Sequence, residues 1–262
     1  MLRSQSRRGF LAGAASAASA LFLAGCDKLD QWSGEESPVR RFLTSAEELT
    51  RSTQRFFLKP SSMAREFTEA DLSRDFRANG STDPDNPDYV ALAANGFADW
   101  KLKVGGLVEA PAEFSLADLR AMPSRTQITR HDCVEGWSCI GKWKGVQLAH
   151  VLDQVKLKPE AKFILFRCAD DLEKTLDNSG RYYETLGLED AFHPQTILAY
   201  DMNDHTLDIP HGAPLRVRVE RQLGYKMAKY VMEIAAVDSY ASLGRGNGGF
   251  WEDRGYEWYA GI

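Results

Sequence analysis

The 262-residue sequence contains few cysteines and has no strong excess of charge of either sign. Four cysteines are too few for a disulfide scaffold, and their spacing gives neither a thioredoxin-like C-x-x-C pair nor a haem-attaching C-x-x-C-H run. The 32 basic and 37 acidic residues give a net charge of −5, which argues against broad nucleic-acid binding. Beyond the first 26 residues, no uncharged apolar run is long enough to predict a membrane span.

The sequence does contain enough apolar material for a packed core. Hydrophobic residues make up 44% of the chain and charged residues 26%, so its bulk is expected to be neither disordered nor fibrous. This length and composition suit one large domain, or one domain with an extension.

The first 26 residues resemble an export signal. They contain three arginines and no acid, and they include an Ala-rich apolar run over 10–25. Ser6-Arg7-Arg8-Gly9-Phe10-Leu11 resembles the twin-arginine export motif, and Leu23-Ala24-Gly25-Cys26 resembles a bacterial lipobox, whose cysteine is lipidated. We therefore expect a twin-arginine, lipoprotein-type signal peptide over 1–26, a periplasmic location and membrane anchoring through Cys26. A plain N-terminal helix is the alternative.

Composition divides the remainder into three parts. Residues 27–96 are expected to form a tether and a helical extension. Residues 97–240 mix strands and short helices in no strict βαβ order, which predicts a domain of the α+β class. Residues 241–262 are rich in Gly and aromatic residues and are expected to form an ordered C-terminal tail.

Hydrophobic periodicity and capping residues predict the individual elements. They are helices over 45–58, 62–78, 115–121 and 146–155, strands over 100–108, 127–130, 162–168, 215–220 and 230–237, and a turn-rich loop over 79–88. Over 215–220, apolar and charged residues alternate, which predicts a half-buried strand with Arg216 on its polar face.

The segment around Cys133, Arg130-His131-Asp132-Cys133-Val134-Glu135-Gly136-Trp137-Ser138, is the most informative in the chain. A cysteine near basic groups is a candidate thiolate nucleophile, and His131 is a candidate base on the same face of an extended strand. A thiolate also suits a transition metal. Zinc fits poorly, because Cys139 lies six residues beyond Cys133 and no spaced His pair accompanies them.

Four sequence signatures, which follow one another along the chain, make the Cys133 segment part of a longer pattern. They are Cys133-Val134-Glu135-Gly136-Trp137 with Trp143-x-Gly145-x-x-Leu148, His193-Pro194-Gln195-Thr196-Ile197-Leu198-Ala199-Tyr200, His211-Gly212-Ala213-Pro214-Leu215-Arg216, and Gly224-Tyr225-Lys226-Met227-Ala228-Lys229. In these signatures, residues 100–240 resemble the molybdopterin-binding domain of the sulfite oxidase family. The resemblance implies the mixed-sheet fold of that family and an oxidoreductase that uses a molybdenum–molybdopterin cofactor for two-electron oxygen-atom transfer.

The resemblance also implies roles for individual residues. Cys133 would be the protein's thiolate ligand to molybdenum, and the pterin dithiolene would supply the other sulfur ligands. Tyr240 matches an active-site tyrosine, and Lys59 falls near a pterin-contacting segment whose usual Arg-Asn-His run is absent here. The cofactor-binding positions are Cys133, Cys168, His211, Arg216, Met227, Ala228 and Lys229. His131 and Arg130 flank the cysteine and are candidates for setting the charge of the substrate pocket.

The substrate and the partners are implied less directly. Val-Glu-Gly-Trp after Cys133 is similar to the Val-Glu-Ala-Trp of the bacterial periplasmic sulfoxide reductase branch, so a small sulfoxide- or sulfite-like oxo compound is expected. No immunoglobulin-like dimerisation domain follows the core, which suggests a monomeric catalytic subunit. Without a haem motif, electrons must pass to or from another protein, for which a membrane cytochrome b is expected. A non-catalytic pterin- or partner-binding module on the same fold is the alternative.

Overall fold

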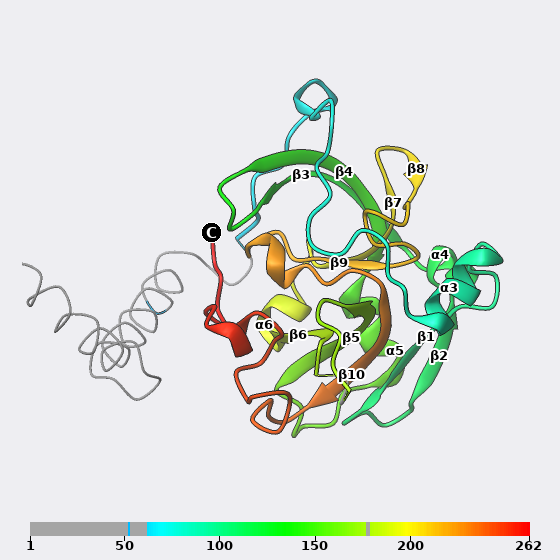
Figure 1. Cartoon of the computed structure of the whole chain (residues 1–262), viewed down its shortest axis with the longest axis vertical. Coiled ribbons are helices and arrows are strands. Elements are labelled where there is room, and N and C mark those ends of the chain that lie inside the picture. Colours follow the sequence, from blue (N-terminus) through cyan, green and yellow to red (C-terminus); the bar gives the residue numbers. More distant parts are fainter. Residues whose placement is uncertain (1–51, 53–61, 177–178) are drawn as a thin grey trace, which may run out of the picture. The chain divides into compact units, whose positions relative to one another are not determined.

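A computed structural model of the chain describes residues 62–176 and 179–262, together with Ser52. The helix expected over 45–58 therefore lies outside the described residues, apart from Ser52, as do the proposed signal peptide and Lys59. Within the described part, two mixed or antiparallel sheets and a few short helices form one body (Figure 1). This arrangement confirms the α+β class. No helix in the described ranges is both long and apolar enough to span a bilayer.

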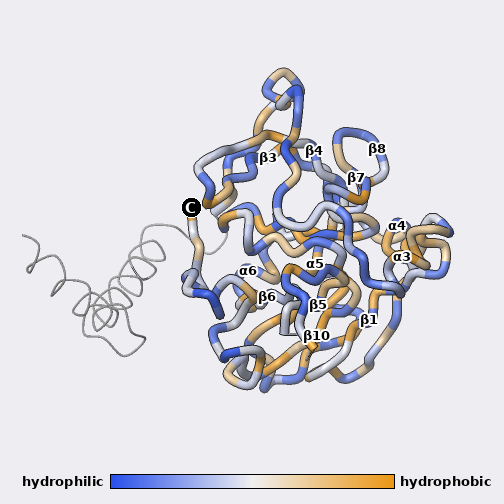
Figure 2. Tube along the Cα trace, viewed as in Figure 1, coloured by the Kyte–Doolittle hydropathy of each residue, from blue (hydrophilic) through white to orange (hydrophobic). Residues whose placement is uncertain are grey.

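The first sheet has the strand order β2-β1-β10-β5-β6. Its strands are β1 (Lys101–Gly106), β2 (Ala112–Ser115), β5 (Phe163–Asp171), β6 (Arg181–Gly187) and β10 (Val231–Val237). β1 pairs with β10 in parallel, whereas the other neighbours are antiparallel. Figure 2 shows stretches of apolar residues along this sheet, as expected for strands that face a core.

The second sheet is antiparallel and has the order β3-β4-β7-β8, with β9 also paired to β7. Its strands are β3 (Ser124–Asp132), β4 (Ser138–Gln147), β7 (Ile197–Met202), β8 (His205–Thr206) and β9 (Arg216–Arg218). β3 and β4 form a long hairpin in unbroken register from Ser124↔Val146 to Asp132↔Ser138. The hairpin therefore holds the loop between its strands, residues 133–137, in a defined position.

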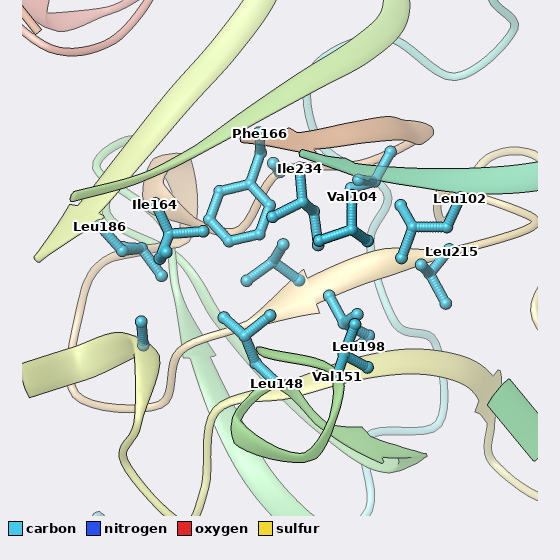
Figure 3. Packing of buried hydrophobic residues seen from close by; sticks show 14 of the residues in the cluster. Leu102, Val104, Leu148, Val151, Ile164, Phe166, Leu186, Leu198, Leu215 and Ile234 are labelled. Carbon is cyan, nitrogen blue, oxygen red and sulfur yellow. The ribbon is translucent and has the colours of Figure 1, made fainter. Parts of the chain in front are cut away.

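Helix α5 (Leu148–Val155) fills the space between the sheets. Its apolar residues recur at helical spacing and all are buried: Leu148, Val151, Leu152 and Val155. Figure 3 shows Leu148 and Val151 pointing toward Phe166 and Ile234 of the first sheet, with Leu198 of the second sheet close by. One hydrophobic core therefore joins both sheets.

Helices α3 (Pro87–Ala94) and α4 (Leu116–Ala121) begin at well-formed caps. The side chain of Asn86 accepts hydrogen bonds from two backbone N–H groups of α3, which has proline at its first position. Ser115 and Asp118 form a reciprocal capping box on α4, so the predicted helix there is confirmed. A single turn, α6 (Leu188–Ala191), follows β6, and 3₁₀ turns occur at Glu69–Asp71, Gly224–Lys226 and Glu252–Arg254.

The helix predicted over 62–78 is wrong. The segment has only the 3₁₀ turn at Glu69–Asp71, and it lies along the β3–β4 hairpin instead. The Phe67 N–H donates to the Ile128 carbonyl, and the Ser73 N–H donates to the Ile140 carbonyl. Long-range pairing with the hairpin thus satisfies backbone groups that a helix would have satisfied locally.

The strand over 215–220 was predicted to be half-buried, but β9 is fully buried. Val217 faces the hydrophobic core, as expected. Arg216 and Arg218 do point to the opposite side, yet both guanidinium groups lie over the ring of Trp143 on β4 and not in solvent. The predicted direction of Arg216 is therefore right, and the strand is fully buried instead of half-buried.

The C-terminal tail belongs to the same body as the sheets. Lys226 lies between the carboxylates of Glu184 on β6 and Glu252 in the tail, at 2.5 Å from each. All three side chains are fully buried. Tyr183 also donates a hydrogen bond to Asp253 at 2.5 Å. These contacts fix residues 249–256 against β6.

Gly145 on β4 permits the close approach of β4 and β7. A Cβ at this position would lie 2.1 Å from the Leu198 carbonyl oxygen, which is backbone and cannot move aside easily. We expect Gly145→Ala to lower the free energy of unfolding by about 3 kcal/mol. Gly105→Ala on β1 is the matched control, because nothing lies within 4 Å of its added Cβ, and it should change stability by less than about 1 kcal/mol. Urea denaturation of both variants checks this, and equal effects would contradict the packing described here.

Candidate functional site

The loop that carries Cys133 closes the β3–β4 hairpin. The Cys133 N–H donates to the Trp137 carbonyl, and the Gly136 N–H donates back to the Cys133 carbonyl, each at 3.0 Å. Gly136 has φ +83°, a conformation that glycine adopts without strain. The tight turn presents the Cys133 side chain half-buried at its edge.

Cys133 opens into a pocket built from six separate parts of the chain. The pocket is lined by Asn79, Gly80, Ser81, Cys133, Val134, Glu135, Asp170, Leu172, Tyr182, Gly224, Tyr225, Met227, Lys229, Trp251 and Tyr256. Thus the loop before α3, the hairpin loop, the ends of β5 and β6, and the segments at 224–229 and 251–256 converge around one thiol. Among the described residues, no group of three or more His, Cys, Asp or Glu side chains could hold a metal ion by itself.

Two cationic side chains lie next to each other beside this pocket. Lys229 lines it and donates to the backbone carbonyls of Asn79, Ser81 and Pro210. Arg216 is only 1% exposed, and its Nη1 donates to the His211 carbonyl at 2.9 Å. Its Nε and Nη2 are buried and have no hydrogen-bond partner among the residues that the structure describes. An unsatisfied buried guanidinium is costly, so this position suits an anionic ligand.

Burial and the charges of neighbouring groups shift the pKa values of Arg216, Lys229 and Asp170. Burial, and then the charge of Arg218, lower the pKa of Arg216 to about 9, so the guanidinium still carries its charge at neutral pH. Burial and the nearby Arg216 lower the pKa of Lys229 to about 7. Asp170 shows the opposite effect, because burial raises its pKa to about 7 and the positive charge of Lys229 offsets only part of that.

A second buried network holds β9 against β3. Arg218 forms a bidentate pair with Glu220, at 2.9 and 2.7 Å, and its Nη1 lies 3.0 Å from Nδ1 of His131. Glu220 also accepts from Gln127 at 2.9 Å. His131 is fully buried in this network. His131 therefore helps to hold the β3–β4 hairpin in place. It does not line the pocket, so it is not in a position to set the charge of a substrate pocket there, as the sequence suggested.

The metal-free thiol chemistry considered for Cys133 finds no support in this geometry. Burial raises the pKa of the Cys133 thiol, which disfavours a free thiolate. Burial, reinforced by the charge of Arg218, holds the pKa of His131 well below its usual value, and its ring faces Arg218 and the sulfur of Met227. Arg130, the other flanking residue, points away to pair with Asp132 at 2.9 Å.

The remaining residues predicted from sequence are placed at different distances from the pocket. Met227 lines the pocket, whereas the Ala228 carbonyl accepts the Val217 N–H at 2.8 Å and so ties the 224–229 segment to β9. Both ring nitrogens of His211 face oxygen atoms, Asp208 Oδ1 at 2.6 Å and the Phe76 carbonyl at 3.0 Å. His211 and Arg216 lie behind Lys229, not in the pocket wall.

Two predicted residues lie elsewhere. Cys168 is buried on β5 and lines a neighbouring hollow, which shares Tyr182 with the pocket of Cys133. Tyr240 does not line the pocket. Its ring contacts Phe163 edge-on and stacks on Trp258 in the tail, which gives it a packing role after the end of β10.

The structure also places residues in the pocket that sequence reasoning missed. Asn79, Gly80 and Ser81 line it, although this stretch was described only as part of a turn-rich loop. Trp251 and Tyr256 line it from the tail. The density of Gly and aromatic residues in the tail was a usable signal, but nothing in the sequence indicates which strand the tail packs against.

Comparison with known proteins places this arrangement in a family. Residues 90–243 match the model of the oxidoreductase molybdopterin binding domain. The chain belongs to this family. It is therefore a molybdopterin-dependent oxidoreductase whose cofactor is molybdenum–molybdopterin, as the four signatures implied.

The chain is also similar to individual proteins. The chain is 33% identical over 255 residues to a putative protein-methionine-sulfoxide reductase subunit YedZ1 of Azospira oryzae. The matched residues cover 97% of this chain and 87% of that protein. The chain is 34% identical over 163 residues to the protein-methionine-sulfoxide reductase catalytic subunit MsrP of Xanthomonas axonopodis pv. citri, covering 60% of this chain and half of that protein. The solved sulfane dehydrogenase SoxCD of Paracoccus pantotrophus aligns with 24% identity and a TM-score of 0.48, over 54% of this chain and 39% of that one.

The residues present fit the cofactor of this family. Arg216 has two unpartnered buried nitrogens, and Lys229 lies beside it, as a phosphate group would require. Gly212 keeps the two side chains close, because a Cβ there would lie 3.0 Å from Cγ of Lys229 and 3.3 Å from Cβ of Arg216. Cys133 offers a half-buried sulfur, which a bound metal would deprotonate. Cys133 would hold molybdenum, and Arg216 and Lys229 would hold the phosphate.

Arg216→Gln separates cofactor binding from folding. The change removes a buried charge without a counter-ion, so the cofactor-free protein should unfold at the same or higher urea concentration than the wild type. The same change should lower the molybdenum content per chain by about tenfold or more, because it removes a cation from the phosphate site. Metal analysis and urea denaturation check both effects, with Arg120→Gln, on exposed α4, as control. Full molybdenum content in Arg216→Gln would contradict the assignment.

Asp170→Asn tests the electrostatics of the pocket. In the cofactor-free protein, folded Asp170 keeps its proton up to about pH 7, whereas the unfolded carboxyl ionises near pH 3.8. Its contribution to the free energy of unfolding therefore falls as pH rises from about 4 to 7, by at most roughly 4 kcal/mol. We expect Asp170→Asn to gain stability relative to the wild type over this range, as measured by urea denaturation at pH 4.5 and 7. The control is Asp153→Asn at an exposed position on α5, whose stability relative to the wild type should not change with pH. A pH-independent difference in stability between Asp170→Asn and the wild type would contradict a raised pKa of Asp170.

Proposed function

We propose that this protein is the catalytic subunit of a sulfoxide reductase, which acts on methionine sulfoxide in proteins. The observation that carries this proposal is the position of Cys133, a half-buried thiol in an open pocket whose wall next to it is largely apolar and aromatic. Val134 is 43% exposed and Tyr256 is 38% exposed, so the pocket is accessible to a side chain on another protein.

The charge of the pocket favours a neutral sulfoxide over sulfite. The charged groups in its lining are Glu135, Asp170 and Lys229. The charge of Lys229 would be taken up by the cofactor phosphate, and the nearby Arg77 lies 3.9 Å from Glu135 and over the ring of Trp137. The Glu135 carboxylate, two residues from the thiol, would repel a sulfite anion. A sulfoxide carries no net charge and has an apolar alkyl portion, which suits the wall.

The names of the relatives support the same substrate. The catalytic subunits from Xanthomonas and from Campylobacter jejuni are both named protein-methionine-sulfoxide reductases. The chain spans only about half the length of these two proteins, so their substrate is transferred here as part of the proposal.

The proposed reaction consumes two electrons and two protons: the S–O bond of the sulfoxide breaks, and a thioether and water form. The cofactor, when bound, supplies a metal centre able to accept an oxygen atom and to exchange two electrons. The protein holds that centre through Cys133 and excludes competing anions through Glu135. Asp170 lines the same pocket and, with a pKa raised to about 7, can hold a proton there at neutral pH.

We further propose that the protein works at the periplasmic side of a membrane. The twin-arginine motif, the apolar run over 10–25 and the lipobox ending at Cys26 support export and lipid anchoring. Electrons would come from a membrane cytochrome b, and the subunit would act as a monomer. A shift in the mass of the mature protein by a lipid at Cys26 would test the anchor.

The proposed reaction is tested by turnover of the cofactor-loaded protein. With a reduced viologen dye as electron donor, we expect reduction of methionine sulfoxide, whereas sulfite with an artificial electron acceptor should give little or no turnover. Cys133→Ser should lower sulfoxide reduction by about 100-fold or more, because it replaces the thiolate ligand. Cys139→Ser is the matched control, since this thiol is buried away from the pocket and contacts the Asp75 carbonyl.

Two results would contradict the proposal. Sulfite oxidation without sulfoxide reduction would overturn the choice of substrate. A protein that binds molybdenum but turns over neither compound would support the non-catalytic binding module.

A further inference from the structure

We infer that the C-terminal tail supplies part of the substrate site: Trp251 and Tyr256, together with Tyr225, form an aromatic wall that binds the alkyl chain and sulfur of a methionine sulfoxide residue. This inference rests on the proposed function and adds the residues that determine substrate specificity. It concerns a part of the chain beyond the family domain, since the match to the family ends at residue 243.

The wall lies in the same pocket as the metal-binding thiol. Trp251 and Tyr256 line the pocket that contains Cys133, and Tyr225 and Val134 line it as well. The tail reaches this position because the neighbouring Glu252 contacts Lys226, which directly follows Tyr225 in the chain. A substrate bound in this pocket can therefore contact both Cys133 and these rings.

The three rings form one connected unit. Trp251 and Tyr256 stack with 24° between their planes and 5.3 Å between centroids, and Tyr256 meets Tyr225 edge-on at 5.1 Å. The Tyr256 N–H donates to the Trp251 carbonyl at 3.1 Å, and the Tyr225 hydroxyl donates to the Glu257 carbonyl at 2.5 Å. The rings are thus held in place before any ligand arrives, which lowers the entropy cost of binding.

The anchor beneath the wall is rigid and buried. Lys226 contacts Glu184 on β6 and Glu252 in the tail, and none of these three side chains is exposed. Phe250 adds a backbone hydrogen bond to the Tyr183 carbonyl at 3.0 Å. If the tail detached, the charges of this anchor would be buried without their partners, which is costly. The anchor therefore fixes the tail in place.

Aromatic rings suit this substrate for a specific reason. Sulfur atoms of methionine make favourable contacts with aromatic rings, and the unbranched side chain adapts to a flat surface. Tyr256 lines the pocket and is 38% exposed, so a side chain of another polypeptide can reach its ring from solvent. The wall therefore fits an oxidised methionine in an accessible stretch of polypeptide.

Equilibrium binding tests the wall directly. The probe is a fluorescently labelled, unstructured peptide with a single methionine sulfoxide, titrated with oxidised, cofactor-loaded protein and followed by fluorescence anisotropy. A peptide with alanine at that position measures binding to the rest of the sequence. We expect Tyr256→Ala and Trp251→Ala to raise Kd for the sulfoxide peptide by about 5- to 10-fold.

Two controls accompany these variants. Tyr256→Phe keeps the ring and should bind as the wild type does. Phe192→Ala removes an aromatic ring of similar exposure, 40%, that does not line the pocket, so Kd should not change. If Trp251→Ala fails to fold, the half-exposed Tyr256 still provides the test.

The outcomes separate this inference from the proposed function. Weaker binding in both alanine variants, with both controls unchanged, supports the wall even if the wild type turns over no sulfoxide. Equal binding by all variants overturns the wall, and so does failure of the wild type to distinguish the sulfoxide peptide from the alanine peptide. Sulfoxide turnover with unchanged binding would leave the proposed function standing and remove only the wall.

Discussion

The candidate functional site is built around a buried cation that no side chain in the described part of the chain neutralises. Arg216 and Arg218 lie two residues apart on β9, both fully buried and both over the ring of Trp143. Arg218 has a bidentate carboxylate partner in Glu220, whereas two nitrogens of Arg216 have no partner. Because the two arginines share the same strand and environment, the difference between them indicates a position left for an external anion.

The rest of the site follows from this constraint. Lys229 lies beside Arg216 and lines the pocket, so the positive charge extends from the buried strand toward Cys133. The buried network of Arg218, Glu220 and His131 joins β9 to β3, whose following loop carries Cys133. One arrangement of two strands therefore positions the cations proposed to bind the phosphate and the thiol proposed to bind the metal. The tail then adds the aromatic rings of Trp251 and Tyr256 to the lining of the pocket.

Local sequence patterns predicted those features of the fold that depend on residues close together in the chain. The capping box of Ser115 and Asp118 and the apolar stripe of α5 are such parts, and both are confirmed. The four signatures predicted the family, which the comparison confirms. The roles assigned to single residues from those signatures stay predictions, although the structure brings Cys133 and Lys229 to one pocket.

The features that local sequence patterns did not predict depend on contacts between segments that are far apart in the chain. The 62–78 segment has helical composition, but its backbone pairs with the β3–β4 hairpin. Tyr240 matches a family position, but its ring packs on Phe163 and Trp258, and the tail brings Trp251 and Tyr256 to the pocket instead. Alternation in β9 predicted which way Arg216 points, but burial of the strand depends on Trp143, over 70 residues earlier. No local pattern contains such information.

We propose that Cys133 is the protein's ligand to molybdenum in this pocket. X-ray absorption at the molybdenum edge measures the number of sulfur ligands directly, in the wild type and in Cys133→Ser with the cofactor loaded. We expect one sulfur ligand fewer in the variant, with the sulfur ligands from the pterin retained. An unchanged sulfur count in molybdenum-containing Cys133→Ser would contradict it.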